Sequence, residues 1–158
     1  MEKIASFTVN HLVLDPGLYL SRQDQVGERT LNSYDLRFTA PNRELVMNTG
    51  EMHTIEHLAA TYLRNDPEFK DEVIYFGPMG CRTGFYLILT DAVEAADVLD
   101  LLKRTFDFVA QFEGEIPGAT ARDCGNYLDH NLEMARYYGA KYLDTLNQIE
   151  DLSFAYQD

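Results

Sequence analysis

Two histidines four positions apart, with a glutamate between them, are the residues of this chain best suited to chemistry. They lie in the run His53-Thr54-Ile55-Glu56-His57. On an α-helix, residues three and four positions apart share a face, so both imidazoles and the carboxylate would project together. Such a pair can bind a divalent metal, and the carboxylate beside it can move protons. The pattern H-x-x-E-H therefore predicts a metal site on a helix, and it is the pattern of inverzincin peptidases.

A catalytic metal needs a third ligand, and Cys124 is the best candidate for it. We expect this cysteine to lie directly before the last helix, which would begin at about residues 123–126, where the helix dipole lowers the pKa of a thiol. A set of two histidines and one cysteine leaves a fourth tetrahedral position open to water or substrate. If the metal only holds the fold, a fourth protein ligand is required, and it would be Cys81, His11 or His130.

The elements that position these residues are predicted from the hydrophobic pattern to form an α+β fold, with an antiparallel sheet packed against helices. Helix 50–63 carries one apolar stripe formed by Met52, Ile55, Ala59 and Leu63, beside the histidine face. The remaining expected elements are strands near 18–20, 30–38, 73–76 and 85–89, and helices over 90–112 and from about 123–126 to 142. Three glycines and a proline in the connection 77–84 indicate a loop that a ligand can approach closely.

Bulk composition predicts an ordinary globular protein, with one domain over residues 1–158. Apolar residues make up 46% and charged residues 25% of the chain. The formal net charge of −13 argues against nucleic acid and anionic membranes as partners, because both attract basic surfaces. With no signal-peptide pattern and only two cysteines, we expect a cytoplasmic protein with reduced thiols, although a Cys81–Cys124 disulfide stays open.

Five sequence blocks together are far more specific than the helix motif alone. They are SFTVNH at 6–11, SYDLRF at 33–38, MHTIEHL at 52–58, GPMGCRTG at 77–84 and ARDCGNY at 121–127. In these blocks the chain resembles the S-ribosylhomocysteine lyase family, whose members release the precursor of the quorum-sensing signal autoinducer-2 and return homocysteine to methionine metabolism. The resemblance implies a metal-dependent lyase that cleaves the thioether of S-ribosylhomocysteine. The products would be homocysteine and 4,5-dihydroxy-2,3-pentanedione, formed by successive carbonyl shifts and a β-elimination.

The resemblance also assigns roles to individual residues. It implies one Fe(II) per subunit, replaceable by zinc or cobalt, on three ligands: His53, His57 and Cys124. Glu56 and Cys81 would be the two acid/base groups. Substrate contacts would come from Ser6, His11, Asp35 and Arg37, some of them reaching the site from the partner subunit of a homodimer with sites at its interface.

Two rival hypotheses remain at this point. An inverzincin-type peptidase would use Glu56 to activate water and a downstream glutamate as its third ligand, and it would normally be built from a much longer chain. A structural metal module would need four protein ligands. Replacement of Cys124 should abolish metal binding in a lyase but not in a peptidase. Replacement of Cys81 should leave the metal bound in a lyase, and loss of the metal would support the structural module.

Overall fold

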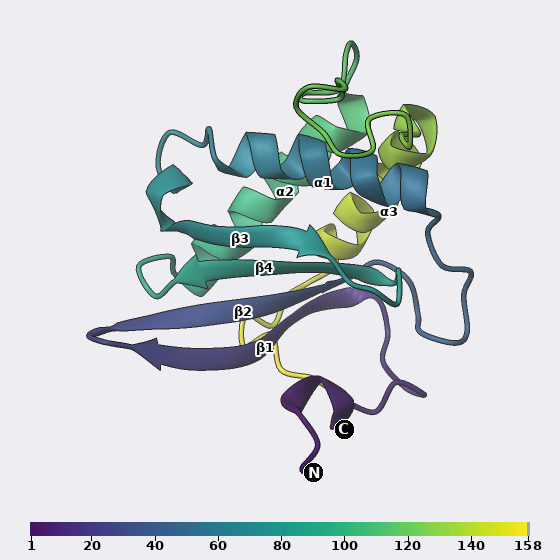
Figure 1. Cartoon of the computed structure of the whole chain (residues 1–158). Helices are drawn as coiled ribbons and strands as arrows, with labels where there is room; N and C mark the ends of the chain where they lie inside the picture. The colour runs from purple at the N-terminus through teal and green to yellow at the C-terminus, as the bar shows by residue number, and fades with distance from the viewer. Residues whose placement is uncertain (158) are drawn as a thin grey trace.

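A computed structural model describes residues 1–157 and shows one four-stranded antiparallel sheet with its helices on one side (Figure 1). The strands follow the spatial order β1-β2-β4-β3. Their bounds are β1 Gly17–Val26, β2 Arg29–Arg37, β3 Val73–Pro78 and β4 Gly84–Thr90. The helices are α1 Thr49–Leu63, α2 Ala95–Gln111 and α3 Leu132–Asn147, with short 3-10 turns η1 Ala5–Phe7 and η2 Lys70–Glu72. The predicted α+β class is confirmed.

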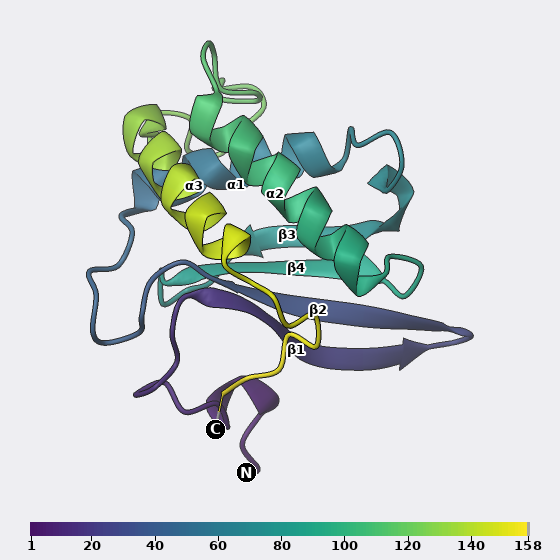
Figure 2. The same ribbon diagram turned by 180° about the vertical axis from the view of Figure 1, so that it is seen from behind.

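The core lies between the sheet and the three helices, as the view from behind makes plain (Figure 2). Fully buried side chains meet there from β2, β4 and all three helices; they include Leu36, Phe85, Ile55, Phe106 and Tyr142. None of the three described α-helices covers the opposite face of the sheet, and the N-terminal and C-terminal segments run beside it (Figures 1 and 2). Among the described residues, no helix combines the length and apolar character needed to cross a membrane.

Helix α1 forms where the apolar stripe predicts it. Met52, Ile55, Ala59 and Leu63 are all buried, so the stripe faces the core and leaves the histidine face free. At its start, the Glu51 carboxylate accepts a hydrogen bond from the backbone N–H of residue 48 at 2.6 Å. This contact satisfies an amide that the helix itself leaves unpaired.

Two predicted helix starts are wrong. Helix α3 begins at Leu132, not at residues 123–126, because Asn131 is its N-cap and accepts a hydrogen bond from Met134 N–H at 3.0 Å. Helix α2 begins at Ala95, not at residue 90, because the carboxylate of Asp91 is engaged elsewhere, with the backbone of β2. Residues 112–131 are therefore an irregular segment without a long helix.

Candidate metal centre and thiol group

The predicted ligands converge although they come from two distant parts of the chain. His53 and His57 lie on α1, and Cys124 lies in segment 112–131, which passes over that helix (Figure 1). Cys124 Sγ is 3.3 Å from His53 Nε2, and the two imidazole rings are 4.6 Å apart and nearly perpendicular. The potential ligand atoms of these residues, together with one from His130, all lie within 4.8 Å of one another.

Backbone carbonyls fix the protonation pattern of both helix histidines. His53 Nδ1 is 2.9 Å from Asp129 O, and His57 Nδ1 is 2.7 Å from Pro117 O. A carbonyl only accepts, so each Nδ1 carries a proton, and in the neutral imidazole Nε2 is the nitrogen that presents a lone pair. This orientation by a carbonyl behind the ring is the usual arrangement around histidines that bind metals.

Cys124 does not lie at a helix N-terminus, so the predicted helix-dipole effect on its thiol does not apply. Helix α3 starts eight residues later, and the thiol lies instead between two turns. The N–H of Asn126 donates to Cys124 Sγ at 3.4 Å. Both cysteines are free, so the disulfide left open by the sequence is not formed.

His130 is the fourth member of the cluster. Its ring stacks on His53 with centroids 4.1 Å apart and meets His57 edge-on at 4.9 Å. Burial, and then the neighbouring His53 and His57, lower the pKa of His130, which favours the neutral imidazole. The donor set of nitrogen and sulfur atoms fits a borderline-soft divalent ion such as Zn(II), Fe(II) or Co(II).

Glu56 lies beside this cluster, as its position in the motif predicts. Its Oε2 atom is 3.8 Å from His57 Nε2, and its side chain is about one-third exposed. The carboxylate is therefore close to the ligand atoms and still accessible to a small molecule.

A second group forms around Cys81 at the turn between β3 and β4. Arg37 pairs with Asp35 at 2.5 Å, with both side chains almost fully buried. The same guanidinium donates to Thr83 Oγ1 at 2.6 Å and lies 3.9 Å from Cys81 Sγ. Because Thr83 Oγ1 accepts from Arg37, its own proton is free to point at the sulfur, 3.1 Å away.

These contacts set the state of the Cys81 thiol. Burial alone raises its pKa, but the hydrogen bonds from Thr83 and the positive charge of Arg37 outweigh burial, and the pKa is lowered overall. A lowered pKa increases the thiolate fraction near neutral pH, which is the form that accepts a proton. The close approach of β2 to this turn depends on Gly84, where a Cβ would lie 2.1 Å from Leu36 O.

Tyr156 completes this second group, and no sequence pattern predicted its position. Its hydroxyl donates to Asp35 Oδ2 at 2.8 Å, and its ring stacks on Tyr19 with centroids 4.8 Å apart. Burial, and then the Asp35 charge, raise the pKa of Tyr156, so the phenol stays protonated and remains a donor. No local pattern links the C-terminal segment to β2, which is why sequence reasoning missed the contact.

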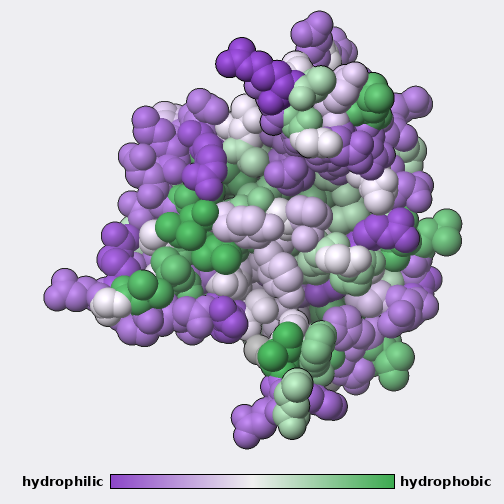
Figure 3. All heavy atoms as spheres, viewed as in Figure 1, coloured by the Kyte–Doolittle hydropathy of each residue, from purple (hydrophilic) through white to green (hydrophobic). Residues whose placement is uncertain are grey.

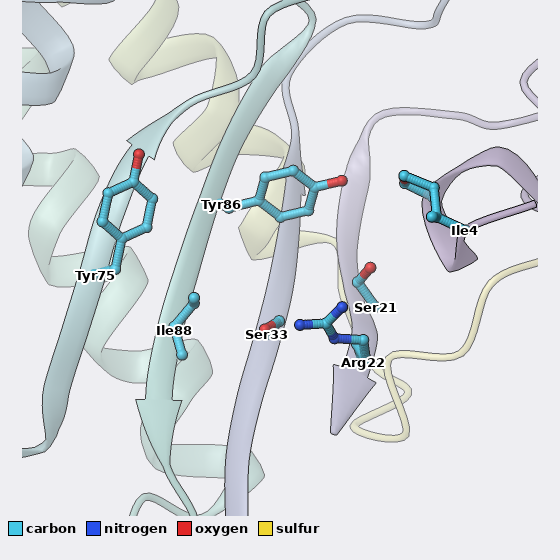
Figure 4. Close-up of a pocket in the computed structure, with 8 residues that line it drawn as sticks. Ile4, Ser21, Arg22, Ser33, Tyr75, Tyr86 and Ile88 are labelled. Carbon is cyan, nitrogen blue, oxygen red and sulfur yellow. The ribbon is translucent and has the colours of Figure 1, made fainter. Parts of the chain in front are cut away.

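Ser6 and His11 are placed apart from the ligand cluster. Ser6 helps to line a cavity of about 270 Å³ on the open face of the sheet, where Tyr86, Ile88 and Tyr75 project from β4 and β3 (Figure 4). His11 Nδ1 lies 2.9 Å from Val9 O. A single chain thus assembles a cluster of potential metal ligands around α1 and a cluster of residues around the Cys81 thiol at the β3–β4 turn. Ser6 and His11 lie in the N-terminal segment.

Fold and donor geometry define an α+β protein with a histidine–cysteine cluster able to hold a metal ion. A sequence profile described as S-ribosylhomocysteinase (LuxS) matches residues 4–152. Proteins named S-ribosylhomocysteine lyase are similar over almost the whole chain: 56% identity over 158 residues in Finegoldia magna, covering 100% of both chains, and 57% over 151 residues in Clostridium acetobutylicum, covering 96% of both. A relative of that name in Porphyromonas gingivalis is 48% identical over 159 residues. The chain belongs to the S-ribosylhomocysteinase (LuxS) family.

Proposed function

We propose that this protein is an S-ribosylhomocysteine lyase, which cleaves the carbon–sulfur bond of its substrate to give homocysteine and 4,5-dihydroxy-2,3-pentanedione. The observation that carries the proposal is the convergence of His53, His57 and Cys124 in a chain of this family. These three residues would hold one Fe(II), for which zinc or cobalt could substitute. When bound, the ion supplies a Lewis acid that polarises the sugar carbonyl.

Glu56 and Cys81 would move the protons. In each carbonyl shift, one group removes a proton from the carbon next to the carbonyl, and a proton returns to the former carbonyl carbon. After two such shifts, the carbon that bears sulfur is β to the ketone. Removal of a proton from the α carbon, which lies between the ketone and that β carbon, then breaks the carbon–sulfur bond. The electron pair of this bond leaves with sulfur as the homocysteine thiolate. The remaining enol tautomerises to the diketone.

The structure of the Cys81 group supports a proton-transfer role for this thiol. Its lowered pKa keeps the thiolate available as a base, and the exposure of Cys81 gives a substrate access to it. The buried Asp35–Arg37 pair would hold the guanidinium beside the thiolate. In the proposal, Asp35 and Arg37 also contribute to substrate contacts at this end of the site.

We further infer that the protein is a homodimer and that the open face of the sheet is its interface. Large apolar side chains are exposed on β3 and in the N-terminal segment, among them Ile4, Phe7, Ile74 and Tyr75, and Figure 3 shows apolar surface in both of these regions. Packing a second copy there would bury this surface. It would also bring Ser6 and His11 of one chain toward the site of the other. We further propose that the enzyme is cytoplasmic and that its thiols stay reduced.

The decisive experiment measures homocysteine release. Anaerobically purified, iron-loaded protein is incubated with S-ribosylhomocysteine and the free thiol is titrated. We expect stoichiometric release, a loss of about 10²–10⁴-fold in Glu56→Gln with unchanged iron content, and no loss in the control Glu68→Gln, an exposed residue. Absence of thiol release by the iron-loaded native protein would overturn the proposed function.

Subunit sharing has its own test. His11→Ala and Glu56→Gln variants are mixed, dissociated and reassociated, because Glu56 lies beside the ligand cluster of its own chain. If His11 serves the partner's site, each mixed dimer contains one intact site, so about one quarter of all sites become active again. No recovery in mixtures that demonstrably contain mixed dimers would contradict the sharing of sites.

The fourth donor in the cluster gives a second candidate function some support. With His130 as a fourth ligand, the metal would be closed off and purely structural, as the sequence analysis allowed. Under the lyase proposal, Cys81→Ala keeps its metal and loses activity. Loss of the metal in a folded His130→Phe variant, together with no homocysteine release by the metal-loaded native protein, would favour the structural alternative.

A further inference from the structure

His130 has a buried ring nitrogen that no described residue satisfies. Its Nε2 atom is shielded from solvent and has no hydrogen-bond partner among the described residues, and one nitrogen of this ring lies within 4.8 Å of the ligand atoms of His53, His57 and Cys124. Unpaired buried polar atoms are rare, and each calls for an explanation, such as a water, an ion or a ligand that binds beside it. The nitrogen is therefore available to pair with a group that enters the cluster.

The hydrogen bonds around Thr54 indicate which ring nitrogen of His130 carries the hydrogen. Thr54 is fully buried, and its hydroxyl donates its single proton to Gly50 O at 2.9 Å. It accepts from Asn131 N–H at 3.0 Å, and its remaining contact is His130 Nδ1, also at 3.0 Å. When the hydroxyl proton is directed at Gly50 O, Nδ1 is the donor in its contact with Thr54 and carries the hydrogen. Nε2 is consequently an acceptor with a bare lone pair.

Ring geometry argues against His130 as a fourth ligand. The lone pair of an imidazole lies in the ring plane, so an ion bound by two imidazoles must lie close to both planes. His53 and His57 are inclined by 85°, and their planes intersect. His130 is stacked on His53 at 4.1 Å with only 19° between the planes, so the in-plane lone pairs of these two rings lie in nearly parallel planes and do not converge on one point.

We propose that His130 Nε2 accepts a hydrogen bond from the hydroxyl group that occupies the position left open by His53, His57 and Cys124. This hydroxyl would belong to water in the free protein and to the sugar chain in the substrate complex. His130 thereby selects a ligand that presents a hydroxyl proton at this position and fixes the direction of that O–H bond. The inference rests on the proposed function for the identity of the sugar and on the cluster geometry for the hydrogen bond.

Binding without turnover tests the proposal. The Glu56→Gln background slows the reaction enough for binding to be measured first, and S-ribosylhomocysteine binding to the cobalt-loaded protein is followed by the visible Co(II) spectrum. Adding His130→Phe keeps a ring that can stack on His53 but removes the acceptor, and we expect affinity to fall roughly five- to tenfold, as for the loss of one hydrogen bond. Adding His130→Gln, whose amide oxygen can accept, should restore part of that affinity.

Cobalt content and resistance to a chelator are measured in the same variants, with circular dichroism to confirm folding. Unchanged content in His130→Phe together with weakened sugar binding supports the proposal. Loss of cobalt in both folded His130 variants would overturn it in favour of direct ligation, and unchanged sugar affinity in His130→Phe would overturn it outright. If the Glu56→Gln protein with native His130 binds cobalt but not S-ribosylhomocysteine, the proposed function fails instead. Cobalt retention in the His130 variants then still shows whether His130 is a metal ligand.

Discussion

Tyr156 reaches back across 121 positions to donate a hydrogen bond to Asp35 at 2.8 Å. Asp35 in turn holds Arg37, and Arg37 lies beside Thr83 and Cys81. The residues matched by the family profile end at 152, so this phenol lies outside the matched region. It nevertheless contacts the charged pair that supports the thiol.

The first prediction concerns this hydroxyl. Tyr156→Phe retains the ring stacked on Tyr19 and removes only the donor to a buried carboxylate, so the free energy of unfolding should fall by about 1–3 kcal/mol. Urea denaturation measures the change. Tyr137→Phe, at an exposed ring, is the matched control and should change stability by less than about 0.5 kcal/mol. Equal effects in the two variants would show that the Asp35 contact adds nothing to stability.

The second prediction concerns the buried ion pair. Asp35→Asn leaves the Arg37 charge without its partner in a site where both side chains are nearly inaccessible, which typically costs about 3–5 kcal/mol. Removing both charges with Asp35→Asn and Arg37→Met should destabilise less than the sum of the two single replacements. A double-mutant cycle in urea measures the coupling, and strict additivity would contradict a direct interaction.

The third prediction concerns the pH dependence of Cys81. Hydrogen bonding and the Arg37 charge lower its pKa against the opposing effect of burial, so the thiolate forms at lower pH than in an ordinary cysteine. Thr83→Val removes one hydrogen bond to the sulfur and should move the alkylation profile to higher pH, whereas Thr83→Ser should leave it nearly in place. Iodoacetamide labelling of the Cys81 peptide, read by mass spectrometry, measures the profile. A Thr83→Val profile that does not move would mean that Thr83 has no influence on the thiolate.

The fourth prediction concerns metal removal. An ion on His53, His57 and Cys124 would join α1 to segment 112–131, and binding at a hundredfold excess over Kd stabilises the folded state by about 2.7 kcal/mol. Chelation should therefore lower the Tm and speed proteolysis within segment 112–131. Cys124→Ala should behave like the chelated protein even with metal present, while Cys81→Ala should respond to metal as the native chain does. Equal protection of Cys124→Ala by metal would exclude Cys124 as a ligand.

Sequence predicted the helix of the metal cluster well because its information is local. The apolar stripe from Met52 to Leu63 fixes which face of α1 is buried, and that face determines where His53 and His57 project. The start of α3 was mispredicted because an N-cap is a choice among several polar residues, and the contact of Asn131 with Met134 decides it.

Contacts between distant segments could not be predicted in this way. The acceptor state of His130 depends on a hydroxyl on α1, and the support of Asp35 depends on the C-terminal segment. Neither relationship leaves a periodic signal in the chain, because each is created by tertiary packing. The sequence named His130 only as one possible fourth ligand, and the ring angles supply the different role proposed for it.

The position of Tyr156 also has a consequence for the order of events during synthesis. The β1–β2 hairpin that carries Asp35 and Arg37 leaves the ribosome early, whereas the phenol that covers the carboxylate emerges only after almost every other element. The Asp35–Arg37 pair is therefore synthesised long before the residue that donates to its carboxylate. A ribosome-bound chain stalled before residue 156 would lack this donor, so the contacts around the Cys81 thiol can be completed only after the C-terminal segment has been made.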